Sequence, residues 1–352
     1  MISCENLKIV ICSGGTGGHI FPAYTLFQAL QKKKSDVVMV TDVRGSTYCG
    51  NISEKVVLNT IRFSCKNILK IGYYSSLAFF KFFKFWFHKH PDIVVGFGGV
   101  FTVIPLIIAR ILGSKIIIYE QNSILGKANR FLVRFADLKL SSFRLNESWI
   151  ETPALVRSEF TKTTLYECEK IIKILVMGGS QGAASFSKII PKAMALLNKK
   201  ERKSIEIIQQ ASYGDVDQLE QAYKALGIKS TLKGFIHDVA EIMLGSQLVI
   251  CRSGASTLSE LAATGRPAIL IPYPNAADNH QFHNALYYKS KKAAWILEEK
   301  EGIVDELGKI LQRILQDREL LKIASFHMMD CSIWRAADNF IKHIELLKAN
   351  GR

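Results

Sequence analysis

The stretch Leu7-Lys-Ile-Val-Ile-Cys12 leads, after Ser13, into the glycine cluster Gly14-Gly-Thr-Gly-Gly-His19. A short apolar run of this kind is typical of a buried parallel strand. The residues from Phe21 to Lys34 then carry apolar side chains at helical spacing and end in lysines, as the C-terminus of a helix prefers. The segment therefore predicts a strand, a glycine loop and a helix in succession.

Three further segments repeat this order. A strand over 171–177 runs into the glycine loop 178–182 and a helix over 183–199, and shorter copies begin at Asp92 and Leu248. Strands that alternate with helices predict parallel sheets with helices on both faces. Because the series restarts near residue 171, we expect an α/β protein of two Rossmann-like, doubly wound domains with a ligand cleft between them.

The domain boundary is expected where the charged run 162–173 interrupts the apolar pattern. We assign residues 1–158 to an N-terminal domain and residues 159–332 to a C-terminal domain, with the last helix, 333–352, packing back onto the N-terminal domain. A chain of 352 residues at 48% hydrophobic composition is long enough for two cores.

The charge of the chain is unevenly distributed. The formal net charge is +15, and residues 1–150 carry 19 Lys and Arg against 8 Asp and Glu, whereas residues 151–352 carry 27 against 23. A basic half indicates an anionic partner, which could be nucleic acid, a phosphorylated substrate or an anionic membrane surface. The seven cysteines include no C-x-x-C pair, which favours a reducing cytoplasm.

The glycine loops predict phosphate binding. A loop between a strand and a helix brings unpaired N–H groups and the positive end of a helix dipole to one point. The first loop fails the dinucleotide pattern G-x-G-x-x-G because Ile20 occupies the third glycine position, and no G-x-x-x-x-G-K-[ST] occurs. Nicotinamide-dependent hydride transfer and P-loop hydrolysis therefore lose support, while a plain tight turn remains the alternative for any one loop.

Two titratable residues follow these loops. His19 stands beside a helix N-terminus, where the dipole disfavours the imidazolium and leaves a neutral ring available as a base, although it could simply cap the turn. Glu260 stands about one turn into the helix after Arg252-Ser-Gly-Ala255, where Ser256 and Thr257 could cap the first N–H groups. Its carboxylate could bind a ribose diol or only compensate the helix dipole. No metal is expected, because His280 and His283 lack a third ligand at workable spacing.

An aromatic and basic stretch covers residues 79–87. Phe79, Phe82, Phe83 and Trp86 share one helical face, and Lys81 and Lys84 lie on another. Such a helix suits the headgroup region of an anionic membrane, so we expect these six residues to contact lipid. A buried helix with snorkelling lysines and a surface for single-stranded nucleic acid are the alternatives.

Six ordered motifs resemble those of the MurG family of bacterial N-acetylglucosaminyltransferases. They are Gly14-Gly-Thr-Gly-Gly-His-Ile-Phe-Pro22, Gly96-Phe-Gly-Gly99, Glu120-Gln-Asn122, Gly178-Gly-Ser-Gln-Gly-Ala183, Cys251-Arg-Ser-Gly-Ala255 with Ser259-Glu260, and Asp278-Asn-His-Gln281. The resemblance runs from Leu7 to about Trp334. It implies a GT-B fold, no cofactor and no catalytic metal.

The family resemblance also implies which residues form the site. His19 occupies the position of the general base. The positions for binding UDP-N-acetylglucosamine are Thr16, Gly17, Gly18, Asn122, Arg157, Ser180, Ile236, Ala255, Ser256, Thr257, Leu258, Ser259, Glu260 and Gln281. Two departures are visible: Tyr119 stands where the family usually has His, and Pro153-Ala-Leu-Val-Arg157 replaces the usual Gly-Asn-Pro-Val-Arg.

The function implied by the resemblance is inverting transfer of N-acetylglucosamine from UDP-N-acetylglucosamine to the C4 hydroxyl of undecaprenyl-diphospho-N-acetylmuramoyl-pentapeptide, a step of peptidoglycan synthesis. The expected partners are these two substrates and an anionic membrane surface, with no nucleic acid. The expected location is peripheral, on the cytoplasmic face of the bacterial inner membrane. The alternatives are another GT-B transferase with a lipid acceptor and a non-enzymatic basic module that binds membrane or nucleic acid.

Overall fold

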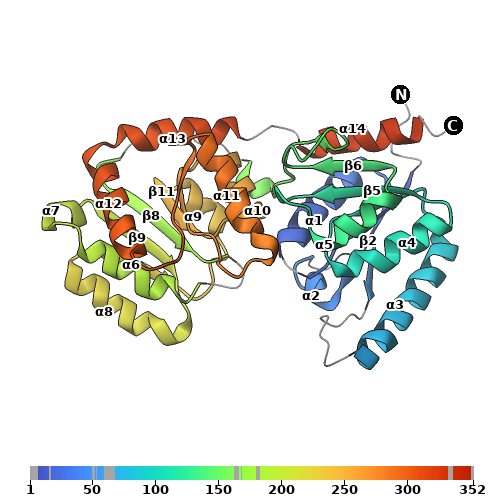
Figure 1. Ribbon diagram of the computed structural model, residues 1–352, viewed down its shortest axis with the longest axis horizontal. Helices are drawn as coiled ribbons and strands as arrows, with labels where there is room; N and C mark the ends of the chain where they lie inside the picture. Colours follow the sequence, from blue (N-terminus) through green and yellow to red (C-terminus); the bar gives the residue numbers. More distant parts are fainter. Residues whose placement is uncertain are drawn as a thin grey trace. The chain divides into compact units, whose positions relative to one another are not determined.

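The computed structural model describes residues 7–15, 17–49, 52, 54–58, 68–161, 166–167, 169–179, 183–331 and 336–349 (Figure 1). The chain divides into two compact units. Unit 1 contains residues 1–157 and 333–352, and unit 2 contains residues 158–332.

Within the described residues, unit 1 forms a seven-stranded parallel sheet in the order β3-β2-β1-β4-β5-β6-β7. The strands are β1 (Lys8–Cys12), β2 (Asp36–Asp42), β3 (Lys55–Leu58), β4 (Ile93–Gly96), β5 (Lys115–Glu120), β6 (Leu138–Ser141) and β7 (Ile150–Glu151). The helices are α1 (Gly17–Lys32), α2 (Val43–Ser46), α3 (Ile68–Lys89), α4 (Val103–Ile111), α5 (Lys127–Leu132) and α14 (Ala336–Ala349), with short 3-10 turns at Val100–Thr102 and Val133–Phe135.

Unit 1 has an apolar core on each face of its sheet. Ile9 and Ile11 of β1 point into one core, which includes residues of α1 and α14, whereas Val10 and Cys12 point into the other, beneath α3 and α4. Successive strand residues face opposite sides, so a strand covered on both faces is apolar throughout. Figure 1 shows helices on both sides of this sheet, with α3 beside α4.

Unit 2 forms, in its described part, a six-stranded parallel sheet in the order β10-β9-β8-β11-β12-β13. The strands are β8 (Ile172–Met177), β9 (Ile205–Gln210), β10 (Lys229–Lys233), β11 (Leu248–Cys251), β12 (Ala268–Leu270) and β13 (Ala294–Ile296). The helices are α6 (Phe186–Ala195), α7 (Lys199–Arg202), α8 (Val216–Leu226), α9 (Val239–Leu244), α10 (Ala255–Thr264), α11 (His280–Ser290), α12 (Ile303–Gln316) and α13 (Glu319–Asp330), with 3-10 turns at Ser158–Phe160, Tyr213–Asp215 and Ala277–Asn279.

The expectation of two doubly wound parallel-sheet units is confirmed. Strand order reverses between β1 and β4 in unit 1 and between β8 and β11 in unit 2. Ligands of open α/β sheets bind outside the carboxyl ends of the strands at such switch points. The four glycine loops found in the sequence follow these four strands.

Two helix boundaries differ from expectation. Helix α1 begins at Gly17 rather than Phe21, because the last glycines of the loop form its first turn. His19 therefore lies within that turn instead of before the helix. The helix expected over 183–199 is two helices, because α6 ends at Ala195 and Asn198 then caps α7 with a reciprocal hydrogen bond to Glu201.

The membrane-facing assignment of Phe82 and Trp86 is wrong. Phe82 is 0% exposed and Trp86 9% exposed, both packed in the core beneath α3 and α4, and the Trp86 indole donates a hydrogen bond to the Ser114 hydroxyl at 2.8 Å. Phe83 is half-buried, whereas Phe79, Lys81 and Lys84 are exposed as expected.

The physical reason is that α3 also has to cover the sheet. Its outer face carries the exposed hydrophobic side chains Tyr73, Leu77, Phe79, Phe80 and Phe87, between 41% and 67% exposed. Among the described residues, no helix has the length and apolar character needed to cross a membrane.

Candidate functional site

The first glycine loop is fixed at the carboxyl edge of the unit 1 sheet. The Asp42 carboxylate at the end of β2 is 4% exposed and accepts hydrogen bonds from the Gly15 N–H at 3.1 Å and the Gly45 N–H at 2.7 Å. Gly15 has a φ of +87°, a conformation that favours glycine. A Cβ on Gly17 would lie 2.8 Å from the Phe21 ring, so a side chain there would displace that ring.

His19 is held between this loop and the ends of two other strands. Gly98 and Gly99, which follow β4 with φ values of +86° and +83°, bring their backbone against the imidazole. A Cβ on Gly98 would lie 3.3 Å from His19 Cε1, and one on Gly99 would lie 3.8 Å from Cδ2. On another side, the Gln121 amide nitrogen is in hydrogen-bond contact with His19 Nδ1. Half-buried His19 is thus surrounded by residues that directly follow β4 and β5.

Glu120 organises the loop that carries Asn122. Its carboxylate is 2% exposed and accepts hydrogen bonds from the N–H and the side-chain amide of Asn122, both at 3.0 Å. It also accepts from the Gly126 N–H at 3.0 Å and the Asn129 amide at 2.9 Å. Asn122 is therefore held at the sheet edge by a buried carboxylate.

Tyr119, at the position where the family usually has His, points into the core. Its side chain is 0% exposed, packs against the rings of Phe97 and Phe340, and shares a hydrogen bond with the Ser142 hydroxyl at 2.5 Å. Burial raises the pKa of Tyr119 to about 12. The phenol therefore stays neutral and links β5 to α14.

Arg157, the last residue of unit 1 before unit 2 begins, lies next to α1. Its guanidinium carbon stands 4.5 Å from the centre of the Phe21 ring, a cation–π geometry. Although Pro153-Ala-Leu-Val differs from the usual family sequence, the Arg157 that follows it still lies near the turn that carries His19.

At the carboxyl edge of the unit 2 sheet, the β11 loop opens into α10. The residue before the helix is Gly254, so no side chain caps it at that position, and Ser256 and Thr257 lie inside the first turn. Ser259 donates its hydroxyl back to the Ala255 carbonyl at 2.9 Å, and Glu260 is buried at 6% exposure. The N–H groups of α10 therefore begin at Ala255, and Ser256 and Thr257 belong to the turn that carries them.

Arg252 joins the loops around that helix start. Its guanidinium donates to the carbonyls of Ile271 at 3.1 Å and Pro272 at 3.2 Å and to the Ser185 hydroxyl at 3.1 Å. It also forms an ion pair with Glu299 at 2.6 Å. Because Arg252 is 8% exposed and its charge is balanced by Glu299, it holds three loops together.

Gln281 is oriented beside the same edge. Its side-chain oxygen accepts from the Tyr273 N–H at 2.9 Å, which leaves the amide nitrogen as the donor toward a ligand. Its backbone carbonyl accepts from the Ser253 hydroxyl at 2.8 Å. Ile236, buried at 8% exposure, follows β10 at the carboxyl end of that strand.

The structure brings most of the expected site residues to two sheet edges. Gly17, Gly18, His19 and Asn122 gather in unit 1, and Ala255–Glu260 and Gln281 gather in unit 2. Leu258, on the inner face of α10, is 0% exposed, so its side chain packs in the core. Thr16 and Ser180 lie outside the described residues. Within the described ranges, no three His, Cys, Asp or Glu residues cluster closely enough to hold a metal ion.

Sequence reasoning missed three residues of this arrangement: Gln121, Asp42 and Arg252. Gln121 is the middle residue of Glu120-Gln-Asn122 and Arg252 directly precedes Ser253-Gly-Ala255, so motif membership was an available signal for both. Asp42 has no such signal, because only the pairing of β2 beside β1 brings it to the first loop.

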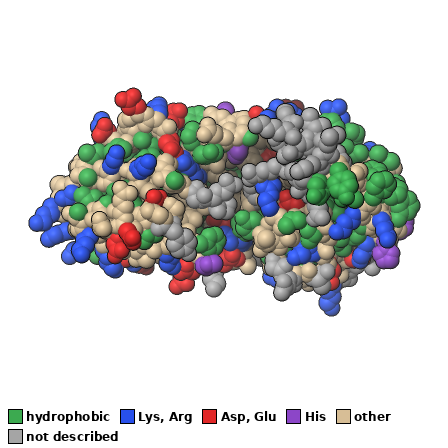
Figure 2. Space-filling model, turned by 90° about the horizontal axis from the view of Figure 1, so that it is seen from below, with side chains coloured by type: hydrophobic (Ala, Val, Ile, Leu, Met, Phe, Trp, Pro, Cys, Tyr) green, Lys and Arg blue, Asp and Glu red, His purple; other side chains and the backbone are tan. Residues whose placement is uncertain are grey.

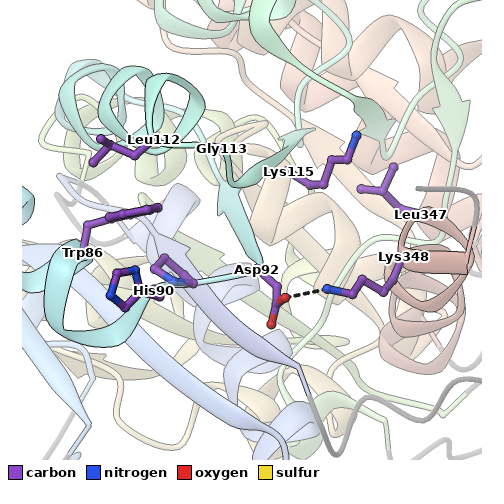
Figure 3. Close-up of a pocket in the computed structure, with 9 residues that line it drawn as sticks. Trp86, His90, Asp92, Leu112, Gly113, Lys115, Leu347 and Lys348 are labelled. Carbon is purple, nitrogen blue, oxygen red and sulfur yellow. Dashed lines mark hydrogen bonds and ion pairs between the residues drawn. The ribbon is translucent and has the colours of Figure 1, made fainter. Parts of the chain in front are cut away.

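A cavity of about 470 Å³ lies in unit 1 near the start of β4 and β5, the sheet edge opposite to His19. Figure 3 shows Trp86 and His90 on one side of it and the Asp92 carboxylate paired with the Lys348 ammonium of α14 on the other. The cavity is therefore separate from the candidate site.

Comparison with known proteins identifies the family. The model of the glycosyltransferase family 28 N-terminal domain matches residues 9–140, and that of the family 28 C-terminal domain matches residues 173–344. A relative from Rickettsia bellii (strain RML369-C) is 35% identical over 92% of this chain and 94% of its own length. Its name is "UDP-N-acetylglucosamine--N-acetylmuramyl-(pentapeptide) pyrophosphoryl-undecaprenol N-acetylglucosamine transferase". The chain belongs to the MurG family of glycosyltransferases.

Further matches agree with membership of the MurG family. A relative of the same name from Paramagnetospirillum magneticum (strain ATCC 700264 / AMB-1) is 34% identical over 91% of each chain. The crystal structure of Acinetobacter baumannii MurG matches with a TM-score of 0.80 at 25% identity, covering 96% of this chain and 99% of that one. The glycosyltransferase of kitacinnamycin, at 13% identity and a TM-score of 0.72, shares the fold. The expected GT-B fold is thereby confirmed.

Proposed function

We propose that this chain transfers N-acetylglucosamine from UDP-N-acetylglucosamine to the C4 hydroxyl of undecaprenyl-diphospho-N-acetylmuramoyl-pentapeptide. The observation that carries the proposal is the match to relatives with this activity in their names over nine-tenths of the chain. The fixed position of His19 on glycine loops supports it, because acceptor activation needs a base held at one place.

The reaction is proposed to be a single inverting displacement. The acceptor oxygen forms a bond to the anomeric carbon of the donor, while the bond from that carbon to the β-phosphate oxygen breaks and its electron pair leaves with UDP. The proton of the C4 hydroxyl passes to His19. Inversion follows because the nucleophile enters on the face opposite to the leaving group.

Unit 2 is proposed to hold the donor. The N–H groups that begin α10 at Ala255 face outward from a helix of ten residues and would bind the diphosphate as its charge develops. Glu260 would accept from the ribose diol, Gln281 would donate to the sugar, and Ile236 would contact the uracil. Thr16, Gly17, Gly18, Asn122, Arg157 and Ser180 complete the proposed set.

A UDP-release assay tests this function. Purified protein should release UDP from UDP-N-acetylglucosamine only when a lipid-diphosphate muramoyl-pentapeptide acceptor is present, and other UDP-sugars should be poor donors. Turnover with a diacylglycerol acceptor instead would identify a different lipid glycosyltransferase. Tight, salt-sensitive binding of polyanions with no turnover would contradict enzymatic function altogether.

We also propose that the chain works as a peripheral protein on the cytoplasmic face of the bacterial inner membrane, held there by α3. The exposed side chains Phe80 at 67% and Phe87 at 50% stand beside Lys84, and Ile111 of neighbouring α4 is 76% exposed. Figure 2 shows hydrophobic side chains with Lys and Arg between them over part of unit 1. Aromatic rings among lysines suit the boundary between lipid headgroups and acyl chains.

Vesicle binding tests this surface. The double substitution Phe80→Ser and Phe87→Ser should weaken binding to anionic vesicles at least about tenfold, because each ring contributes roughly 1.5–3 kcal/mol when it leaves water. Turnover of a short-chain soluble acceptor should be kept. The matched control is Phe326→Ser, a 63% exposed Phe on α13 of unit 2. Unchanged vesicle binding by the double variant would contradict the proposal.

A further inference from the structure

The contact between Gln121 and His19 joins residues 102 positions apart in the sequence. Gln121 directly follows β5 and is 5% exposed, with its amide nitrogen against His19 Nδ1. Its amide oxygen is buried and has no hydrogen-bond partner among the residues that the structure describes. A buried amide whose one terminus meets a histidine nitrogen is a feature of the site that the motifs did not assign.

The loop that follows β4 lies close to the imidazole. The Gly98 backbone lies close enough that a Cβ there would come 3.3 Å from His19 Cε1 and 3.4 Å from Nδ1. The Gly99 backbone approaches the opposite ring carbon, Cδ2. The ring thus has Nδ1 toward Gln121, and Nε2 lies between Cε1 and Cδ2, the ring carbons nearest to Gly98 and Gly99.

The orientation of the amide decides where a neutral imidazole carries its single proton. If the NH₂ group faces Nδ1, the proton sits on Nε2, and Nε2 can only donate. If the oxygen faces Nδ1, the proton sits on Nδ1 and donates to that oxygen, so Nε2 carries the lone pair. The two termini of an amide are nearly equal in size and shape, so the same side-chain position serves either arrangement.

We propose that Gln121 is a positioning residue that presents its side-chain oxygen to His19 Nδ1–H and so keeps Nε2 unprotonated to receive the acceptor's proton. A neutral imidazole without an acceptor at Nδ1 favours the opposite tautomer, with the proton on Nε2. This inference rests on the proposed role of His19 as the base. Holding the catalytic histidine of a serine protease in the wrong tautomer costs about 10⁴ in kcat, which is an upper limit for what this contact controls.

The group that contacts His19 Nδ1 is a neutral amide and not a carboxylate. The neighbouring carboxylate of Glu120 accepts four hydrogen bonds from Asn122, Gly126 and Asn129. Gln121 thus orients the imidazole without adding a negative charge beside it.

The tautomer is measured directly by ¹⁵N NMR of the full chain labelled at histidine, with the His19 signals assigned by their loss in His19→Gln. In the neutral form, wild-type His19 should show a protonated Nδ1 and an unprotonated Nε2. In Gln121→Met, which has similar length but no amide, the proton should move predominantly to Nε2. A proton on Nε2 in the wild type, or no change in the Met variant, would overturn the proposal.

Turnover gives the second readout. Gln121→Met should lower kcat by more than about tenfold but by less than His19→Ala does, with the KM for UDP-N-acetylglucosamine changed less than about twofold. Gln121→Glu, whose carboxylate can only accept from Nδ1–H, should retain kcat within about tenfold and keep the wild-type tautomer. Gln31→Met, an exposed substitution on the same helix as His19, is the matched control.

The two hypotheses fail in distinguishable ways. If His19→Ala keeps near wild-type turnover, His19 is not the base, whereas the NMR result still decides whether Gln121 fixes its tautomer. If Gln121→Met melts at a lower temperature than the wild type, the kcat comparison uses Gln121→Glu instead. A folded Glu variant that keeps the wild-type tautomer but loses kcat would count against the positioning role.

Discussion

One side chain is held in place at the carboxyl edge of each sheet, His19 in unit 1 and Arg252 in unit 2, and the interactions that hold the two differ in kind. In unit 1, uncharged contacts hold His19: the backbones of Gly98 and Gly99 and the amide of Gln121. In unit 2, Arg252 is held by charge, through an ion pair with Glu299 and hydrogen bonds to two carbonyls and a hydroxyl.

The difference explains how one strand, loop and helix pattern supports two tasks. A half-buried imidazole in contact with a neutral amide can exchange a proton, which suits the proposed role of a base. A buried guanidinium neutralised by a carboxylate cannot easily bind a ligand, so in the proposed function the N–H groups at the start of α10 bind the anion in unit 2.

Removal of the imidazole should have the largest effect. His19→Ala is expected to lower kcat about 10²- to 10⁴-fold, the usual contribution of a placed general base. Affinity for UDP-N-acetylglucosamine should stay unchanged if unit 2 holds the donor. Steady-state kinetics together with calorimetric titration of the donor measure both quantities, and near wild-type kcat in the variant would remove His19 from the role of base.

Breaking the ion pair between Arg252 and Glu299 should mainly lower the free energy of unfolding. Arg252→Met leaves the Glu299 carboxylate without its partner and is expected to cost about 3–5 kcal/mol in the free energy of unfolding. Glu299→Gln, which keeps a polar group beside the guanidinium, should cost less. Urea denaturation followed by tryptophan fluorescence measures both variants, and equal stability of Arg252→Met and the wild type would show that the pair is not needed to hold these loops.

A methyl group beside the imidazole should have an intermediate effect. Gly98→Ala forces a φ of +86° on a residue with a side chain and places a Cβ 3.3 Å from His19. The strain alone should cost about 1–3 kcal/mol in stability, and displacement of His19 should lower kcat in addition. Gly113→Ala is the matched control, because its φ is +94° and nothing lies within 4 Å of the new Cβ. Equal kcat in the two variants would show that the glycine loop does not position the ring.

The smallest expected effect concerns the ion pair at the opposite edge of unit 1 (Figure 3). Burial is the largest single effect on Asp92 and raises its pKa, but the hydrogen bonds from Lys348 at 2.5 Å and from the Lys8 N–H at 3.0 Å, together with the charges of both lysines, lower the pKa below its ordinary value near 3.8. The pair should therefore stabilise the folded state above pH 3.8 and lose this contribution as the pH falls through the lower folded pKa.

Lys348→Met tests this pair. It should cost about 1 kcal/mol at neutral pH, and the difference from wild type should shrink below pH 3.8. Thermal melting as a function of pH measures the difference, with the exposed Lys342→Met on the same helix as the control. A pH-independent difference would indicate lost packing of α14 instead of a lost ion pair.

Most of the fold could be predicted from local pattern. The strands after which the glycine loops follow, at Leu7–Cys12 and 171–177, appear in the structure as β1 and β8 within a residue of expectation. Apolar runs before glycines reveal buried parallel strands because both faces of such a strand are covered. The start of α1 could not be predicted as well, because the glycines at 17 and 18 continue into the helix despite their low propensity.

The buried face of α3 could not be predicted from its residues. Aromatic side chains occur on nearly every side of the helix between 79 and 87, so the periodicity does not reveal which side meets the sheet. Packing against α4 buries Phe82 and Trp86 and leaves Phe80 and Phe87 exposed.

The sequence by itself determined the two doubly wound sheets, their glycine loops and the place of His19 after the first loop, because these depend on short-range pattern. Only the tertiary structure decided that Gln121 meets His19 and that Arg252 is neutralised by Glu299. Such contacts depend on strand order: β4 lies beside β1 and β5 beside β4, which brings residues 102 positions apart to one edge of the sheet.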